Sequence, residues 1–184
     1  MFNFIKYFKN KKLIKKDCKL DEEGRCLIEI AIKDRSEVLS PYVINGQETI
    51  NSEFASALDN AVKSVSPKKD IHLYIEGNGF SDQDKNTFAL AIKNYYLNST
   101  LESQRKIKNN MILFIIMSIM SLITLTALFL VNYFEVNWLI IEVFDIIVWV
   151  FVWEAVDLLA FQRSMIVFDR QRSYKVYRSK ISFK

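Results

Sequence analysis

Glycine and proline are scarce in this chain, which has four glycines and two prolines among 184 residues. All six lie before Phe80, so the second half of the sequence contains neither of the two residues that most readily interrupt a helix. We therefore expect the helix that begins near Ser81 to continue through the charged stretch Glu102–Lys108 into the apolar sequence that follows. Such a helix would be roughly 75 Å long at ~1.5 Å per residue.

Histidine and cysteine are also nearly absent, which argues against an enzyme or a metal site. His72 is the single histidine, and no cysteine or carboxylate lies near it at the sequence spacing of a metal site or a catalytic triad. Cys18 and Cys26 are too far apart for a C-x-x-C unit, and we expect neither a disulfide nor a zinc site from them. We predict no enzymatic activity, and no catalytic, cofactor-binding or metal-binding residues.

Lysine and arginine are missing throughout residues 111–161, where two long apolar runs flank a short polar break at Asn132–Asn137. Each run exceeds the ~20 residues that a helix needs to cross the ~30 Å hydrocarbon core of a bilayer. The first run, Met111–Val131, has almost no polar face, which a core helix of a soluble domain would show. These features predict a two-helix transmembrane hairpin.

Positive charge gathers on both sides of this region. The first twenty residues carry seven lysines and one acid, and the tail after Gln162 has a similar basic excess. The positive-inside rule then predicts a multi-pass protein of the cytoplasmic membrane with both termini in the cytoplasm. The predicted segments are a basic amphipathic segment (1–20), a cytoplasmic α/β domain (21–110), the hairpin (111–161) and a basic tail with a closing strand (162–184). The first segment suits a helix on an anionic membrane surface or a solvated end.

Alternating apolar residues predict three strands, at Cys26–Ile32, Ile71–Glu76 and Ser179–Phe183. A helix capped by Asn51 or Ser52 should lie between the first two, and Ser81 with Asp84 resembles a capping box for the next helix. We expect the last strand to pair with the first. The predicted fold class is an α+β membrane protein, with the two-helix hairpin inserted near the C-terminal end of a small cytoplasmic α/β domain.

Four acids of the second apolar run fall within about half the circumference of a helix. An ionised acid near the middle of a bilayer costs several kcal/mol, so this face should point toward protein or water. Hydroxyl side chains of the first run recur every three residues and could meet it. The candidate intramembrane polar face comprises Glu142, Asp145, Glu154, Asp157, Ser118, Ser121 and Thr124. The candidate basic residues at the membrane interface are Lys106, Lys108, Arg163, Arg170 and Arg172.

Three interpretations of the acids remain open. They hold helices together by hydrogen bonds or by pairing with Arg163, they line a cation-conducting path, or the outer pair lies at the membrane interface. We expect a non-catalytic, homo-oligomeric, membrane-anchored assembly or interaction module. The alternative is a small oligomeric cation channel or membrane-permeabilising effector gated by the cytoplasmic domain. Expected partners are the lipid bilayer, further copies of the chain and a protein on the cytoplasmic side, without nucleic acid or cofactors.

The second apolar run also carries a tryptophan–acid motif, Trp149-x-x-x-Trp153-Glu154-x-x-Asp157-Leu158-Leu159, followed by Arg170-Gln-Arg172-Ser-Tyr174. Together with Ser40-Pro41-Tyr42, it resembles a family of small, uncharacterised bacterial two-span membrane proteins with this motif in the last span. The resemblance covers about residues 26–183 and rests on short motifs. Members often have proline after the first acid, where this chain has Ala155, which puts a kink in doubt. The resemblance implies an architecture and no activity.

Overall fold

The computed structural model describes residues 18–66, 69–77, 79–134 and 137–183. It divides into two compact units, one formed by the chain up to Thr100 together with the segment from Gln171, the other by Leu101–Arg170. The predicted basic amphipathic segment, residues 1–20, lies outside the described residues except for its last three.

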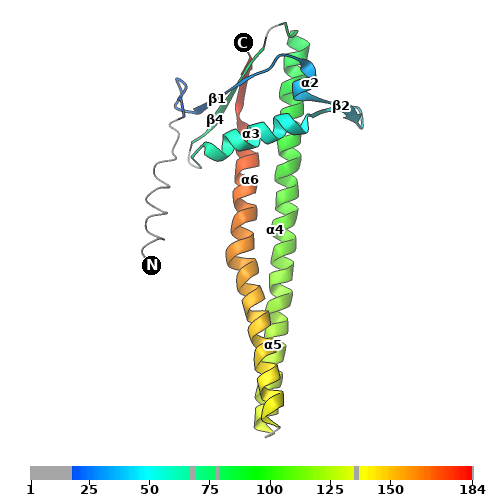
Figure 1. Cartoon of the computed structure of the whole chain (residues 1–184), viewed down its shortest axis with the longest axis vertical. Coiled ribbons are helices and arrows are strands. Elements are labelled where there is room, and N and C mark those ends of the chain that lie inside the picture. The colour runs from blue at the N-terminus through cyan, green and yellow to red at the C-terminus, as the bar shows by residue number, and fades with distance from the viewer. Residues whose placement is uncertain (1–17, 67–68, 78, 135–136, 184) are drawn as a thin grey trace. The chain divides into compact units, whose positions relative to one another are not determined.

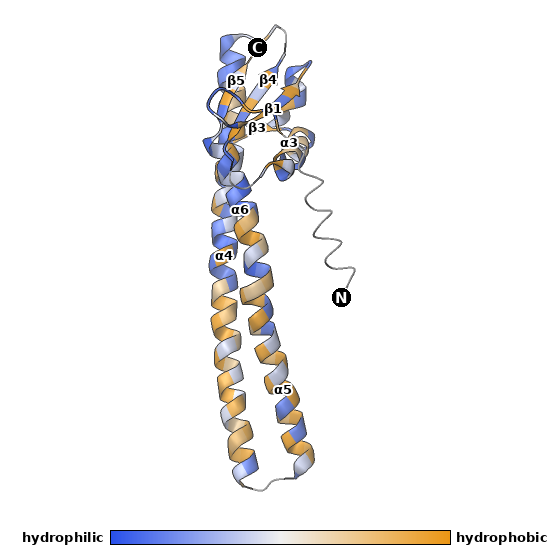
Figure 2. Ribbon diagram, turned by 90° about the vertical axis from the view of Figure 1, so that its left-hand side faces the viewer, coloured by the Kyte–Doolittle hydropathy of each residue, from blue (hydrophilic) through white to orange (hydrophobic). Residues whose placement is uncertain are grey.

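A three-stranded parallel sheet is the framework of the first unit. Its strands are β1 (Cys26–Ala31), β4 (Ile71–Glu76) and β5 (Lys180–Phe183), in the order β1-β4-β5, and Figures 1 and 2 show them side by side. All three predicted strands are thus confirmed, but the expected pairing of the last strand with the first is wrong. The outer edge of β1 is occupied by the preceding residues, because Leu27 N–H donates to the Lys19 carbonyl, so β5 joins the free edge of β4.

One face of this sheet forms the core of the unit. Along β4 the alternate residues Ile71, Leu73 and Ile75 are buried, whereas His72 and Tyr74 on the opposite face are only partly covered. The buried face packs with helix α3 (Ser52–Ser64) and with apolar residues of the long helices. The most deeply buried side chains are Cys26, Val38, Leu58, Leu73, Ile75, Phe88, Ile92, Tyr96 and Val176.

Local capping explains where the helices of this unit begin. The Asn51 side chain accepts a hydrogen bond from Glu53 N–H at the start of α3, as the sequence predicts. Between β1 and α3 the chain forms the short helix α2 (Arg35–Val38) and an antiparallel hairpin of β2 (Leu39–Ile44) and β3 (Gln47–Ile50). Its turn, Asn45-Gly46, has φ of 52° and 73°, which favours these two residue types in a tight hairpin.

Helix α4 (Asp82–Tyr133) is continuous over 52 residues, or ~78 Å at 1.5 Å per residue. Ser81 and Asp84 exchange hydrogen bonds at its start, since Asp84 N–H donates to Ser81 Oγ and Ser81 donates back to the Asp84 carboxylate. The capping box and the uninterrupted helix that the lack of glycine and proline predicts are both confirmed.

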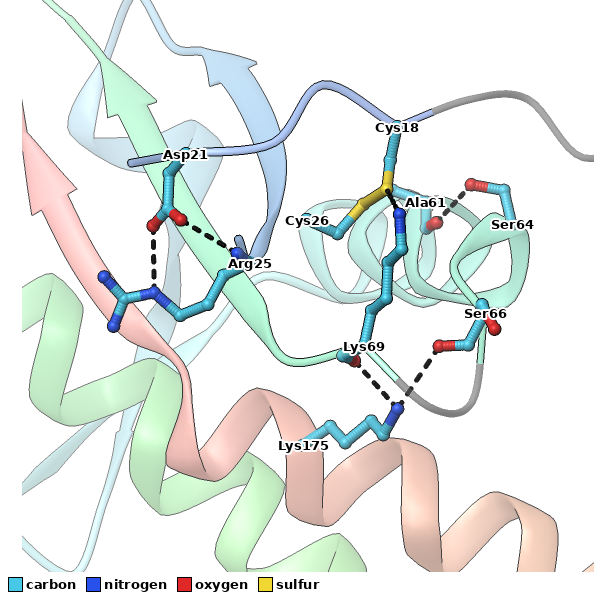
Figure 3. The surroundings of a disulfide bond; sticks show 9 residues. All are labelled: Cys18, Asp21, Arg25, Cys26, Ala61, Ser64, Ser66, Lys69 and Lys175. Atoms are coloured by element: carbon cyan, nitrogen blue, oxygen red, sulfur yellow. Dashed lines mark hydrogen bonds and ion pairs between the residues drawn. A yellow bond between two sulfur atoms is a disulfide. The ribbon is translucent and has the colours of Figure 1, made fainter. Parts of the chain in front are cut away.

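The chain then forms α5 (Trp138–Val156), a π-helical segment (Asp157–Gln162) and α6 (Arg163–Arg178) before β5. Lys175 of α6 donates to the carbonyl oxygens of Ser66 and Lys69, which attaches the end of this helix to the sheet unit (Figure 3).

The predicted fold class is contradicted, because no two-helix transmembrane hairpin fits the structure. Among the described helices, only α4 is long and apolar enough to cross a membrane. Helix α5 has 19 residues and includes Glu142, Asp145 and Glu154, and the helix geometry changes immediately after it. The apolar run after Asn137 is long in sequence, but four acids interrupt it and its last residues belong to the π-helical segment.

The buried face of β4 generates a stability prediction. Leu73→Ala should destabilise the sheet unit by ~2–5 kcal/mol because Leu73 is fully buried in the core. Leu90→Ala is the matched control, since Leu90 of α4 is 62% exposed and its truncation should change stability by about 0.5 kcal/mol or less. Chemical unfolding in detergent, followed by hydrogen exchange of the β1 and β4 amides, measures both. Equal effects of the two substitutions would contradict this core.

Candidate functional site

The predicted acidic residues lie on α5 and at the start of the π-helical segment. Glu142, Asp145 and Glu154 are exposed, and Asp157 is half-buried. Asp157 accepts a hydrogen bond of 2.7 Å from Gln162 Nε2, its neighbour on the next turn. Glu142 and Asp145 also line a cavity of about 580 Å³ together with Asn132 and apolar side chains.

The predicted hydroxyl residues of α4 face elsewhere. Ser118 donates to the Phe114 carbonyl and Thr124 to the Met120 carbonyl, each at 2.8 Å, so both hydroxyls bond within their own helix. Ser118 and Ser121 line a second cavity, of about 240 Å³, whose other walls are apolar: Phe114, Val152, Ala155, Val156 and Leu159. Ser118 and Ser121 therefore line a different cavity from Glu142 and Asp145.

The predicted basic residues are spread over α4 and α6. Lys106 forms a 2.7 Å ion pair with Glu102 one turn earlier, on the exposed surface. Arg163 is half-buried, and Lys108, Arg170 and Arg172 are exposed.

A polar cluster that the sequence did not predict occupies the face of the sheet opposite the core. His72 of β4 lies between two oxygens: its Nδ1 is 2.8 Å from Asp21 Oδ2, and its Nε2 is 2.9 Å from Ser182 Oγ of β5. The Asp21 and His72 side chains are each only 12% exposed. We call these three residues the His72 cluster.

Asp21 is held ionised by its surroundings. Burial alone would raise the pKa of its carboxyl group, but this effect is outweighed by hydrogen bonds from Arg25, from His72 and from Glu23 N–H. The pKa of Asp21 therefore lies well below its ordinary value. Figure 3 shows two of these bonds, from the backbone N–H and the Nε of Arg25, at 2.8 and 2.9 Å.

The ionised carboxylate fixes the proton on the imidazole. Asp21 can only accept, so His72 Nδ1–H donates to it; in the neutral imidazole Nε2 then has a free electron pair that accepts from the hydroxyl of Ser182. The result is a chain of two hydrogen bonds that runs from a serine hydroxyl through an imidazole to a carboxylate.

The loop that carries Asp21 is closed by a disulfide between Cys18 and Cys26, shown in Figure 3. The expectation that these cysteines form no disulfide is wrong. They are eight positions apart in the sequence, but an antiparallel bridge between Leu20 and Cys26 turns the chain back and brings the Cα atoms of the two cysteines to 5.5 Å. Lys69 Nζ lies 4.0 Å from Cys18 Sγ. Sequence spacing alone could not reveal this return of the chain.

A cavity of about 520 Å³ opens beside the His72 cluster. Its walls come from the disulfide loop, from β1 and from the same face of β4 and β5. The lining residues are Leu20, Asp21, Glu22, Glu23, Arg25, Leu27, Glu29, His72, Tyr74 and Lys180.

Comparison of the chain with protein-family models, curated proteins and solved structures found no match. The resemblance to small two-span bacterial membrane proteins therefore stays a prediction.

The electrostatics of Asp21 predict acid sensitivity. Because its folded-state pKa lies below the unfolded value of ~3.9, its contribution to stability is complete above about pH 4 and is lost as the pH falls below that. Asp21→Asn should remove this part of the acid sensitivity, whereas Glu22→Gln, at an exposed neighbour, should leave it unchanged. Unfolding midpoints between about pH 2 and 6 measure the effect. A variant with the wild-type pH slope would contradict it.

Reduction should loosen the disulfide loop. Breaking a bond that closes a loop of this length costs about 2–3 kcal/mol. Reduced wild type and the Cys18→Ser variant should show the same loss of amide protection over residues 19–25. Intact mass after alkylation without reductant checks the bond itself: complete alkylation of both cysteines in air-exposed protein would rule it out.

Proposed function

We propose that this protein is a membrane-anchored interaction module that assembles with further copies of itself. The observation that carries the proposal is the uncovered apolar surface of α4. Over its second half almost no side chain is buried, and Figure 2 shows this part of the helix as predominantly hydrophobic. Exposed large apolar residues there include Ile112, Ile115, Ile116, Ile119, Leu122, Ile123, Leu125 and Phe129.

An apolar surface of this size has to be shielded from water by lipid or by a partner. Soluble proteins rarely leave a contiguous apolar patch of this extent in water, and a helix that is apolar all round is typical of a membrane span. A bilayer would cover the exposed apolar side chains of α4, so the proposed anchor is α4 itself.

Self-assembly is supported by the outer face of α5. Trp149 and Trp153 are 65% and 66% exposed and follow each other by one turn, in line with Glu142 and Asp145. Tryptophan is enriched among the residues that dominate binding energy at protein interfaces. A second copy that packed against this face would cover both indoles and shield the acids from apolar surroundings.

A further protein partner is supported by the β2–β3 hairpin of the sheet unit. Tyr42, Val43 and Ile44, next to its turn, are all more than half exposed. Three successive exposed apolar residues on a projecting hairpin favour a docking surface over a solvated loop.

The basic residues next to the apolar stretch of α4 indicate on which side of the membrane the sheet unit lies. Arg105, Lys106 and Lys108 precede the apolar stretch of α4, which favours a cytoplasmic location for the sheet unit. Cellular reductants would then act on the Cys18–Cys26 disulfide.

Membrane attachment and assembly are tested together. The full chain should stay in the membrane pellet after alkaline carbonate washing and should form a defined oligomer in mild detergent. The double variant Trp149→Ala, Trp153→Ala should weaken the oligomer by at least ~1 kcal/mol per indole, or roughly thirty-fold in dissociation constant. Leu122→Ala on α4 is the control, since Leu122 is 65% exposed and a lipid-facing side chain should not affect assembly.

Two results would contradict the proposal in different parts. Release of the wild type by carbonate would reject the membrane anchor. A monomeric wild type, or a Trp variant with unchanged oligomer stability, would reject assembly through α5.

A further inference from the structure

The His72 cluster goes beyond the proposed function, because its hydrogen-bonded order is that of a nucleophile, a general base and an orienting acid. We propose that Ser182, His72 and Asp21 form an acyl-transfer site that hydrolyses a small, neutral carboxylic ester. Three elements distant in sequence supply the residues: the disulfide loop, the central strand and the last strand.

The geometry supplies the proton path. Ser182 Oγ is 2.9 Å from His72 Nε2, and His72 Nδ1 is 2.8 Å from the Asp21 carboxylate. The first distance is that of a nucleophile and base that are hydrogen-bonded before substrate arrives, and the second is that of a base held by an orienting acid. With Nδ1–H directed at Asp21, Nε2 is the only imidazole nitrogen that can take the serine proton.

Asp21 acts through His72 and is a positioning residue. Arg25 and two backbone N–H groups hold its carboxylate, so it keeps the imidazole in one tautomer and one orientation. A fixed carboxylate also stabilises the imidazolium that forms when Ser182 loses its proton. The disulfide closes the loop that carries this group.

The adjacent cavity can accept the acyl group. Ser182 pairs in register with Tyr74, which lines the cavity, and Lys180 lies two residues before Ser182 on the same face of β5. Lys180 Nζ lies 3.6 Å from Glu23 Oε1, and both residues line the cavity.

The charge of the lining selects the substrate class. Four carboxylates surround the cavity, from Asp21, Glu22, Glu23 and Glu29, against two cations, Arg25 and Lys180. This excess of negative charge disfavours an anionic substrate, so a neutral ester fits best.

The reaction balances in two steps. Ser182 Oγ attacks the ester carbonyl carbon while its proton passes to His72 Nε2; the bond to the leaving alcohol then breaks, and the alcohol takes that proton. Water attacks the acyl-serine, gives a proton to Nε2, and Ser182 leaves with that proton as carboxylic acid is released. Ester and water become acid and alcohol, and the site returns to its starting state.

A fluorophosphonate probe tests the nucleophile in the full chain held in detergent micelles. Ser182 Oγ should displace fluoride from phosphorus, and peptide mass spectrometry should locate one adduct on Ser182. Ser182→Ala should lose the adduct and the hydrolysis of p-nitrophenyl acetate. Ser99→Ala is the matched control, because Ser99 is another half-buried, hydrogen-bonded serine of the same unit, paired with Ser173.

The other two residues have distinct expected effects. His72→Gln should slow labelling at least ~100-fold, the usual contribution of a general base. Asp21→Asn should lower kcat by at least ~10-fold with a smaller change in KM, because it disturbs the tautomer of His72 but keeps a side chain of the same size at the cavity wall. Hydrogen exchange of β4 confirms that each variant is folded.

A second variant tests whether His72 activates the group at position 182 when this group is a thiol in place of a hydroxyl. Ser182→Cys should react with iodoacetamide near neutral pH at least ~10-fold faster when His72 is present than in the double variant with His72→Gln. Three results would each overturn the acyl-transfer site: a folded wild type without an adduct on Ser182, unchanged hydrolysis in Ser182→Ala, or equal thiol reactivity of Ser182→Cys with and without His72. None of these results bears on membrane attachment or on assembly.

Discussion

The exposed apolar surface of α4 is the constraint on which the rest of the molecule depends. One helix begins in a capping box beside the parallel sheet and continues, without a break, into a stretch whose side chains are covered by almost nothing within the described chain. Its first turns contribute Phe88, Ile92 and Tyr96 to the core of the sheet unit. The same helix therefore contributes to a protein core at one end and leaves apolar side chains exposed at the other.

Much of this organisation could be predicted because it depends on local patterns. Alternation identified the strands, and the lack of glycine and proline predicted the continuous α4. The alternation of apolar residues indicates which face of a strand is buried, but it does not indicate which strand it pairs with. The predicted pairing of β5 with β1 is therefore wrong, and β5 pairs with the free edge of β4. The prediction of a transmembrane hairpin is wrong because it relies on the length of the second apolar run. The three acids of α5 distinguish this helix from the uncharged stretch of α4.

The His72 cluster illustrates what sequence spacing cannot reveal. His72 lies 51 positions from Asp21 and 110 positions from Ser182 in the sequence. The three residues meet because β5 pairs with β4 and the disulfide loop reaches the same face of the sheet. One signal was available. Ser182 alternates with Ile181 and Phe183, as His72 alternates with Ile71 and Leu73, so each polar residue lies on the non-core face of its strand. Knowledge of the β4–β5 pairing would have brought the two together.

The most direct test of the membrane anchor is an accessibility scan along α4 in lipid vesicles. Spin labels placed singly from residue 112 to residue 130 report collisions with oxygen, which partitions into the bilayer, and with a polar nickel chelate, which does not. A spanning α4 predicts high oxygen accessibility and low chelate accessibility through the middle of this stretch, with chelate accessibility rising toward both ends. Uniform access of the chelate along the stretch would contradict a membrane-spanning α4.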